Sequence, residues 1–219
     1  MSTQTLGLSE QLHRYVVAHN PPEDGVLADI ASETRRRWPD SVNMQIAPEQ
    51  GAFLALLTEL VAPRLAVEVG TFTGYSSVWI ARALPTGGRL RCFDASTEWT
   101  AVARQAWQRA GLDDRITLHL GDATETLAPA LSDDEPVGLA FIDADKPAYP
   151  DYYETLLARL APGGLIAVDN TLANARVLDP QDDDAAAIAA FNRRVTDDER
   201  VTSVLTPIGD GLTLIRPRG

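Results

Sequence analysis

Apolar residues recur along the chain in two alternating patterns, short continuous runs and longer segments with helical spacing. The short runs, rich in β-formers, lie at residues 65–70, 89–94, 115–122, 137–143 and 164–170. The segments 76–84, 99–111 and 152–164 between them space apolar residues as helices do and end at or beside glycine or proline. Strands that alternate with helices usually form a parallel sheet with crossover helices. The pattern therefore predicts an α/β protein with a mostly parallel sheet.

The two ends of the chain depart from this alternation. Residues 1–64 precede the first predicted strand and have a helical pattern, and the acidic stretch from residue 179 is expected to lead from a loop into a helix. The final segment, "RVTSVLTPIGDGLTLIRPRG", holds two strand-like runs around a Gly-Asp-Gly turn and predicts an antiparallel hairpin. We expect one domain over 1–219, with a helical segment at 1–64 and the core at 65–219.

Composition narrows the class of partner. The 219 residues carry a net charge of -12, which disfavours nucleic acid because binding to phosphates relies on Lys and Arg. No apolar run approaches the roughly 20 residues of a membrane span, and the N-terminus lacks the pattern of a signal peptide. We expect a cytoplasmic protein with a small-molecule partner, and no partnership with nucleic acid or membrane. The single cysteine, Cys92, is expected in a buried strand, and the scattered histidines do not suggest zinc or a catalytic triad.

The loop after the first predicted strand, "EVGTFTGYSS", suggests a ligand site. Gly70 and Gly74 permit close approach of the backbone, and Ser76 stands near the start of the next helix. The spacing differs from the G-x-G-x-x-G pattern that holds a pyrophosphate, which argues against NAD or FAD. A tight turn without a ligand is an equal alternative for this loop.

Two aspartates at later strand ends extend the candidate site. Asp94 ends the second predicted strand, where an acidic residue accepts hydrogen bonds from ribose hydroxyls. Together with the glycine loop, it suggests a nucleoside without phosphates. Asp122, after the third strand, would border the adenine or cap the following helix.

A second group of polar residues ends the fourth and fifth strands. Asp143 closes one, and Asp169 and Asn170 close the other. Adjacent strand residues face opposite ways, so Asp169 and Asn170 share an ion only if the chain turns there. Two carboxylates and an amide oxygen form a hard ligand set suited to Mg²⁺, whereas the alternative is that they cap helices. Asp145 shares the strand face of Asp143, and parity alone does not choose between them.

Lys146 is the only lysine among the 19 basic residues of the chain. Arginine stays protonated, but a lysine near other cations and away from water can lose its proton. Our hypothesis is that Lys146 takes a proton from a hydroxyl near the metal. The alternative is a surface lysine retained by chance.

Four separated segments, "EVGTFTGYSS", "FIDADKPAY", "DNTLANARVLDP" and "PIGDGLTLI", resemble the cation-dependent, S-adenosylmethionine-dependent O-methyltransferases of the catechol and caffeoyl-CoA type. The resemblance covers roughly residues 40–219. It implies a Rossmann-like class I methyltransferase fold, in which a seven-stranded, mostly parallel sheet has an antiparallel last strand and helices on both faces. It also implies a homodimer, and methyl transfer to one of two vicinal hydroxyls of a phenolic small molecule.

The resemblance also assigns residues. It implies that the cofactor, S-adenosylmethionine, is surrounded by Met44, Glu68, Gly70, Ser76, Asp94, Asp122, Ala123 and Asp143. For Met44, filling the core is an alternative role. It selects Asp143 over Asp145 as a ligand, with Asp169 and Asn170, of Mg²⁺ or another divalent cation, and it makes Asp143 and Lys146 the catalytic pair.

The acceptor is left open by the sequence. Family members often read D-N-x-L-W-x-G where this chain has "DNTLANA", so Ala173 and Ala175 argue against a standard caffeoyl-CoA pocket. "RRR" at 35–37 would attract an acidic acceptor such as a CoA ester, or simply form a solvated helical face. Two alternatives to a catechol methyltransferase are the same chemistry on a non-catechol oxygen pair, such as a hydroxamate or natural-product intermediate, and a noncatalytic cofactor-binding scaffold.

Overall fold

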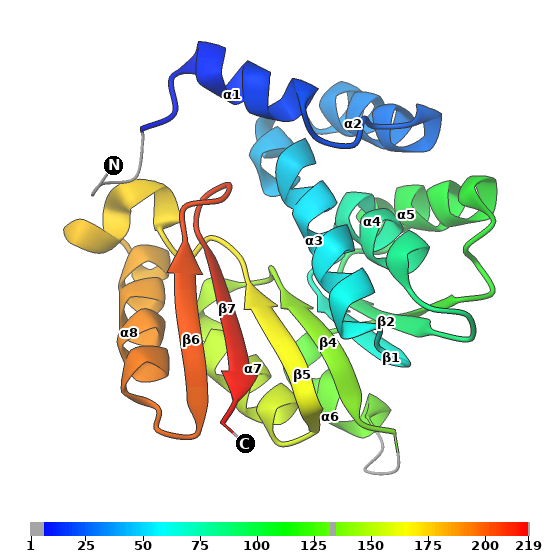
Figure 1. Cartoon of the computed structure of the whole chain (residues 1–219). Helices are drawn as coiled ribbons and strands as arrows, with labels where there is room; N and C mark the ends of the chain where they lie inside the picture. Colours follow the sequence, from blue (N-terminus) through cyan, green and yellow to red (C-terminus); the bar gives the residue numbers. More distant parts are fainter. Residues whose placement is uncertain (1–6, 132–134, 219) are drawn as a thin grey trace.

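A seven-stranded sheet forms the centre of the molecule (Figure 1). The structure is a computed structural model that describes residues 7–131 and 135–218. The strand order is β3-β2-β1-β4-β5-β7-β6, in which β7 runs antiparallel to both of its neighbours. The strands are β1 (Leu65–Val69), β2 (Arg89–Asp94), β3 (Ile116–Leu120), β4 (Val137–Ile142), β5 (Leu160–Val168), β6 (Val201–Thr206) and β7 (Leu212–Pro217). The predicted fold class and the C-terminal hairpin are confirmed.

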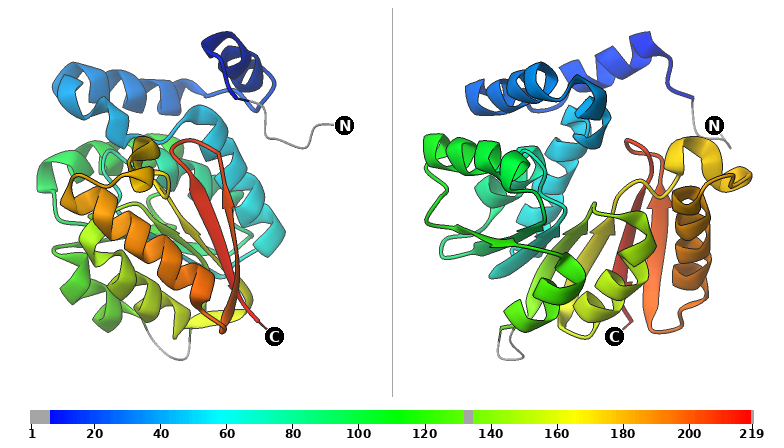
Figure 2. Two further views of the ribbon diagram at one scale, coloured as in Figure 1. Left: turned by 90° about the vertical axis from the view of Figure 1, so that its left-hand side faces the viewer. Right: turned by 180° about the vertical axis from the view of Figure 1, so that it is seen from behind.

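Helices cover both faces of the sheet (Figure 2). One face packs against α3 (Pro48–Val61), α4 (Tyr75–Ala83) and α5 (Thr97–Ala110), and the other against α6 (Ala123–Ala130), α7 (Tyr149–Leu157) and α8 (Asp183–Asp197). Outside the first layer, α2 (Gly25–Arg37) lies against α4 and α5. The remaining elements are α1 (Glu10–Ala18) and the short 3-10 helices η1 (Pro39–Met44), η2 (Lys146–Ala148) and η3 (Ala173–Leu178).

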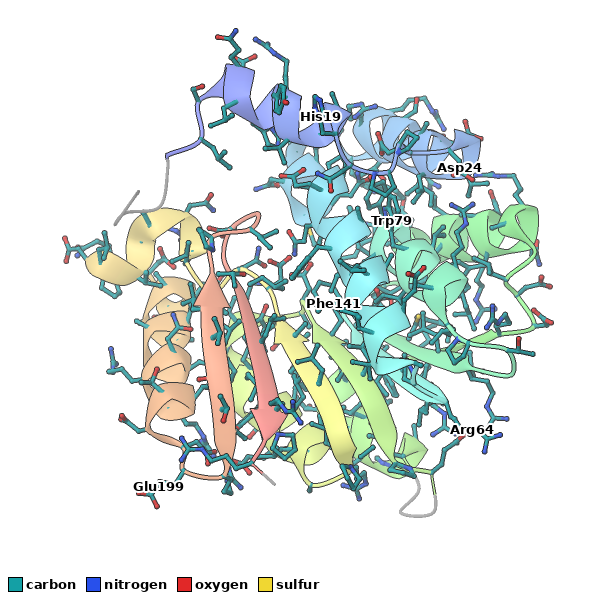
Figure 3. All side chains as sticks on the ribbon, in the orientation of Figure 1. His19, Asp24, Arg64, Trp79, Phe141 and Glu199 are labelled. Atoms are coloured by element: carbon teal, nitrogen blue, oxygen red, sulfur yellow. The ribbon has the colours of Figure 1, made fainter. Side chains whose placement is uncertain are left out.

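The two faces hold separate apolar clusters because strand side chains alternate. In β1, Ala66 packs on the α3 and α4 side, whereas Val67 packs on the α7 side. Figure 3 shows Phe141 inside this framework and Glu199 on its periphery. Cys92 is fully buried in β2, as expected. Within the described ranges, no helix is long and apolar enough to cross a membrane.

Several predicted boundaries differ from those in the structure. The helix predicted over 152–164 ends at Leu157, and β5 begins at Leu160 rather than at residue 164. Leu160 pairs with Val137 across an irregularity in the β4–β5 register, and Gly163 takes a positive φ of 79° there. The third strand is also shorter than predicted. The helical prediction for 1–64 is met by α1, α2, η1 and α3, while residues 1–6, and Gly219 of the hairpin segment, lie outside the described residues.

The loops that form the site gather at one edge of the sheet, and side-chain caps fix where the helices after them begin. Ser96 caps α5 by accepting a hydrogen bond from Trp99 N, and Asp182 caps α8 by accepting from Ala185 N. The aspartates at 182–184 therefore start α8, as their pattern predicted. Because β1, β2, β4 and β5 run parallel, the loops that follow them gather at the same edge.

Candidate functional site

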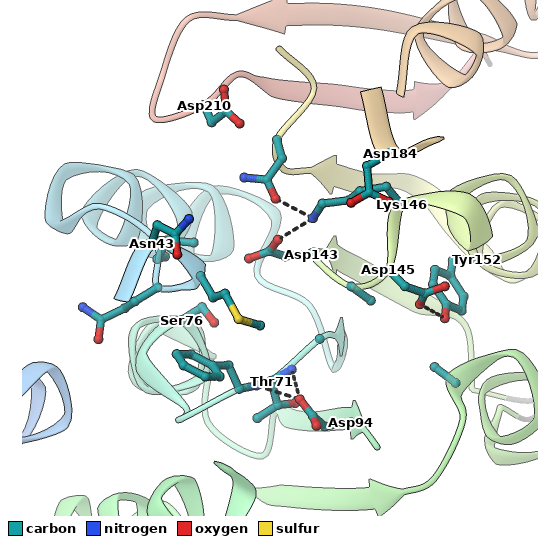
Figure 4. Close-up of a pocket in the computed structure, with 18 of the residues that line it drawn as sticks. Asn43, Thr71, Ser76, Asp94, Asp143, Asp145, Lys146, Tyr152, Asp184 and Asp210 are labelled. Atoms are coloured by element: carbon teal, nitrogen blue, oxygen red, sulfur yellow. Dashed lines mark hydrogen bonds and ion pairs between the residues drawn. The ribbon is translucent and has the colours of Figure 1, made fainter. Parts of the chain in front are cut away.

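A cavity of about 710 Å³ lies beyond the carboxyl ends of β1, β2, β4 and β5 (Figure 4). Segments from residues 43 to 210 line it, which brings most of the predicted site together. The predicted residues on its walls are Met44, Gly70, Ser76, Asp94, Asp122, Ala123, Asp143, Lys146 and Asn170. Glu68 and Asp169 lie behind the walls and do not line the cavity.

Gly70 makes the turn that brings the ends of β1 and β4 close together. Its φ is 91°, and its N–H donates to the Phe93 carbonyl at 2.9 Å. A Cβ added there would collide with the backbone carbonyl oxygen of Asp143. The glycine is therefore required both by its backbone conformation and by the close approach of the Asp143 segment.

Asp94 holds the loop after β1. One carboxylate oxygen accepts from Thr71 N at 3.0 Å and Phe72 N at 2.7 Å, and the other accepts from Ser96 N at 2.7 Å. A carboxylate has about four acceptor positions, so one is left for a ligand on the cavity side. The predicted ribose contact is compatible with this geometry. Asp94 also shapes the loop itself, which sequence reasoning missed.

Asp122 caps a helix and also lies on the cavity wall, while its predicted contact with adenine stays a prediction. It caps α6 by accepting from Thr124 N at 2.8 Å and from the Thr124 hydroxyl at 2.7 Å, and these bonds lower the pKa of its carboxyl. It also lines the cavity beside Ala123. Met44 is 44% exposed at the cavity, so the alternative that it fills the core is excluded.

Glu68 lies under the glycine loop rather than on the cavity wall. It is fully buried in β1, and the Cys92 thiol donates to its carboxylate at 3.3 Å from β2. Burial raises the pKa of Glu68 to about 7. Its contact with the cofactor stays a prediction, and its position indicates a support for the loop.

Lys146 joins the ends of β4 and β5. Its Nζ donates to Asp143 Oδ1 at 3.2 Å, to the Tyr149 hydroxyl at 2.8 Å and to Asn170 Oδ1 at 2.5 Å. Figure 4 shows Lys146 directed at Asp143, while Asp145 is held by the Tyr152 hydroxyl at 2.7 Å. The contact with Lys146 thus distinguishes Asp143 from Asp145, whereas the alternation of strand side chains did not.

The chain turns directly after β5. Asn170 has a φ of 56°, and Asp169 is 2% exposed with one oxygen accepting from Asn170 N at 2.7 Å. Adjacent residues of a regular strand face opposite ways, so this turn is what allows Asp169 and Asn170 to face the same site. Burial raises the pKa of both Asp143 and Asp169; the Lys146 charge opposes the rise at Asp143, and the Asp143 charge adds to it at Asp169.

Sequence reasoning missed several residues of the site. Tyr149 carries a hydroxyl that contacts Lys146, and burial raises the pKa of its phenol well above the ordinary value, so it stays protonated. Its only sequence signal is a position three residues after Lys146. Other side chains on the cavity wall that no pattern singled out as functional are Tyr75, Trp99, Asn174, Arg176, Asp184 and Asp210.

The family model described as O-methyltransferase matches residues 17–218. A probable caffeoyl-CoA O-methyltransferase of Dictyostelium discoideum is 38% identical over 86% of this chain and 85% of its own. A catechol O-methyltransferase of Niastella koreensis is 35% identical over 88% and 89% of the two chains. The O-methyltransferase TomG from Streptomyces achromogenes, involved in tomaymycin synthesis and solved in complex with S-adenosylmethionine, superposes with a TM-score of 0.84 at 30% identity, over 97% and 100% of the chains.

Proposed function

Since the chain belongs to the O-methyltransferase family, as an S-adenosylmethionine-dependent enzyme, we propose that it methylates one of two vicinal hydroxyls on a small aromatic acceptor with the help of a divalent cation. The observation that carries this proposal is the convergence of Asp143 Oδ1 and Asn170 Oδ1 on Lys146 Nζ at the cavity wall. The noncatalytic scaffold considered from the sequence is set aside by the family.

The donor atoms at the β4 and β5 ends fit a hard cation. Asp143, Asp169 and Asn170 offer carboxylate and amide oxygens, which are the ligands that Mg²⁺ prefers. Among the described residues, no group of three or more His, Cys, Asp or Glu side chains is placed to hold a metal, so a softer ion has no competing site there. These three residues would hold the cation, which supplies Lewis acidity and alignment for a hydroxyl pair.

The protein's own residues supply orientation and a proton acceptor. Lys146 Nζ, as the neutral amine, takes the proton of the acceptor hydroxyl. S-adenosylmethionine, when bound, would supply the methyl group to the freed oxygen and would leave as S-adenosylhomocysteine. Asp94 and the Gly70 loop would hold the cofactor and orient it toward the acceptor hydroxyl.

Charge at the acceptor end favours a neutral or cationic acceptor. Asp145, Asp184 and Asp210 line the cavity. Two basic side chains are among its described lining residues. Lys146 donates to Asp143 and Asn170, and Arg176 pairs with Asp182 at 2.5 Å. An acceptor with carboxylate or phosphate groups would meet these carboxylates with no unpaired basic side chain among the described lining residues, which argues against a CoA ester.

The loop after β5 makes an open wall for this acceptor. Ala173, Asn174 and Ala175 take left-handed conformations with φ of 47°, 52° and 64°. Asp210 supports the loop, since its carboxylate accepts from Asn174 N at 2.6 Å. The alanines lack the aromatic side chain common in the family. The same chemistry on a non-catechol oxygen pair is therefore the second candidate.

A substrate series tests both parts of the proposal. With S-adenosylmethionine and Mg²⁺, catechol should be methylated, whereas resorcinol and phenol, which lack vicinal hydroxyls, should not. Equal rates on phenol and catechol would contradict the requirement for an oxygen pair. A hydroxamate methylated in place of catechol would favour the second candidate.

Charge is tested with two substituted catechols. The aminoethyl catechol should have a lower KM than the carboxyethyl catechol, and Asp184→Asn should narrow that difference. Asp151→Asn, an exposed aspartate of α7 that does not line the cavity, is the matched control. A preference for the carboxyethyl compound would contradict the charge argument.

A further inference from the structure

The hydroxyl of Tyr149 occupies a defined place between Lys146 and the end of β5. It accepts from Lys146 Nζ at 2.8 Å and donates to the Asp169 backbone carbonyl at 3.2 Å. Because its only hydrogen is committed to that carbonyl, the oxygen presents a lone pair to the lysine. The hydroxyl thus has a fixed direction.

Packing fixes the ring that carries this hydroxyl. Tyr149 is fully buried and meets Phe191 edge-on, with ring centroids 5.7 Å apart and planes at 83°. Lys146 Nζ also lies 5.0 Å from the centre of the Tyr149 ring. The phenol is therefore a rigid anchor for the tip of a flexible side chain.

We infer that Tyr149 is a positioning residue that holds the Lys146 amine in the orientation needed to accept the proton of the acceptor hydroxyl. This inference rests on the proposed role of Lys146. A lysine has a long and flexible stem, so its nitrogen needs an external constraint. To accept a proton, the amine needs a lone pair, so it then keeps only two of the three hydrogen bonds that Nζ donates to Asp143, Tyr149 and Asn170. An N–H held by the Tyr149 oxygen limits the directions open to that lone pair.

A single-atom change separates the hydroxyl from the ring. Tyr149→Phe keeps the aromatic packing and the ring contact with Lys146, and it removes only the oxygen. The matched control is Tyr153→Phe, because Tyr153 is on the same helix and also meets Phe191 edge-on. The Tyr153 hydroxyl donates to Asp198 at 2.8 Å and does not contact Lys146.

Steady-state kinetics with catechol, Mg²⁺ and S-adenosylmethionine give the first readout. Tyr149→Phe should lower kcat about 10-fold to 100-fold, the usual range for losing a partner that orients a site residue, with cofactor Kd and catechol KM nearly unchanged. Tyr153→Phe should stay within a few-fold of wild type. Equal effects of the two variants on kcat would overturn the inference.

A double-mutant cycle shows whether Tyr149 acts through Lys146. In a Lys146→Ala background, Tyr149→Phe should cause no further loss of rate. A full additional loss in that background would mean a general structural role and would overturn the inference. Wild-type rates for Lys146→Ala alone would instead contradict the proposed function, so the two failures are distinguishable.

A third readout does not depend on turnover. Because Lys146 is the only lysine, protein grown with ¹⁵N-lysine has one side-chain nitrogen signal in a tag-free chain. Tyr149→Phe should shift or broaden that signal, whereas Tyr153→Phe should leave it in place. An unchanged signal in Tyr149→Phe would show that the hydroxyl does not hold the amine.

Discussion

At the scale of single residues, Lys146 separates the effect of positive charge from that of proton transfer. Lys146→Arg keeps the charge but cannot give up a proton. If Lys146 is the proton acceptor, kcat should fall by about 10²–10⁴, with cofactor affinity unchanged because the cofactor's proposed contacts lie elsewhere. Raising the pH should partly restore the rate. Initial rates measure kcat, and calorimetry measures cofactor affinity. A Lys146→Arg variant with kcat within a few-fold of wild type would exclude the proton-transfer role.

Gly70 offers a second test at this scale, with a control in the same chain. Gly70 and Gly87 both have positive φ, but a Cβ at Gly87 meets nothing within 4 Å, whereas one at Gly70 collides with the Asp143 backbone. Gly87→Ala should cost about 1–2 kcal/mol of unfolding free energy from backbone strain alone. Gly70→Ala should cost about 1–3 kcal/mol more. Urea unfolding measures the difference, and equal losses would contradict the close approach.

Residues at strand ends were predictable because a parallel sheet gathers them at one edge. Asp94, Asp143 and Asn170 reach the cavity for that reason. The burial of Glu68 behind the cavity wall was not predictable, because the motif gives its position in the chain but not its depth below the loop. The role of Tyr149 depends on how α7 packs against the end of β5, which no local pattern encodes.

At the scale of elements, neighbouring strands β1 and β2 bury an ionisable pair. The folded state raises the pKa of Glu68 from 4.5 to about 7, so the protonated form is favoured on folding. Its contribution to stability is fully present below pH 4.5 and is lost as the pH rises through about 7, to a total of up to about 3 kcal/mol. Glu68→Gln keeps the shape and should flatten this part of the profile.

Denaturant unfolding of both proteins between pH 5 and pH 8 measures this effect. The pKa values of Asp143 and Asp169 are also raised, so both proteins should lose stability as the pH rises. Wild type should lose it more steeply than Glu68→Gln does, because only wild type carries the Glu68 carboxyl. Parallel profiles for the two proteins would show that Glu68 ionises in the folded state as it does in water.

Element boundaries show where sequence patterns stop being informative. Apolar residues at 156, 157 and 160 fit a helix as well as a strand, so the start of β5 was read as the end of a helix. Pairing of Leu160 with Val137 decides the matter, and pairing is a long-range contact. Helix caps such as Asp182 were predictable because they depend on adjacent residues only.

At the scale of the whole molecule, the alternation of strands and helices was sufficient to predict the fold class. The antiparallel direction of β7 was predicted from the resemblance and the hairpin signal, whereas its position between β5 and β6 was not predicted. The cavity combines η1 before the sheet with the turn between β6 and β7 near its end. Its acceptor end could not be predicted, since it depends on which distant loops meet.

The dependence of methyl transfer on a divalent cation is the central claim of the proposed mechanism. The direct measurement is the rate of S-adenosylhomocysteine formation from catechol by chelator-stripped enzyme, before and after adding Mg²⁺, with cofactor Kd measured by calorimetry under both conditions. The proposed contacts of the cofactor do not include the cation, so its Kd should stay constant while activity is lost and then restored. Asp169→Ala should bind cofactor and remain inactive with Mg²⁺. Full activity in metal-free buffer would contradict the mechanism.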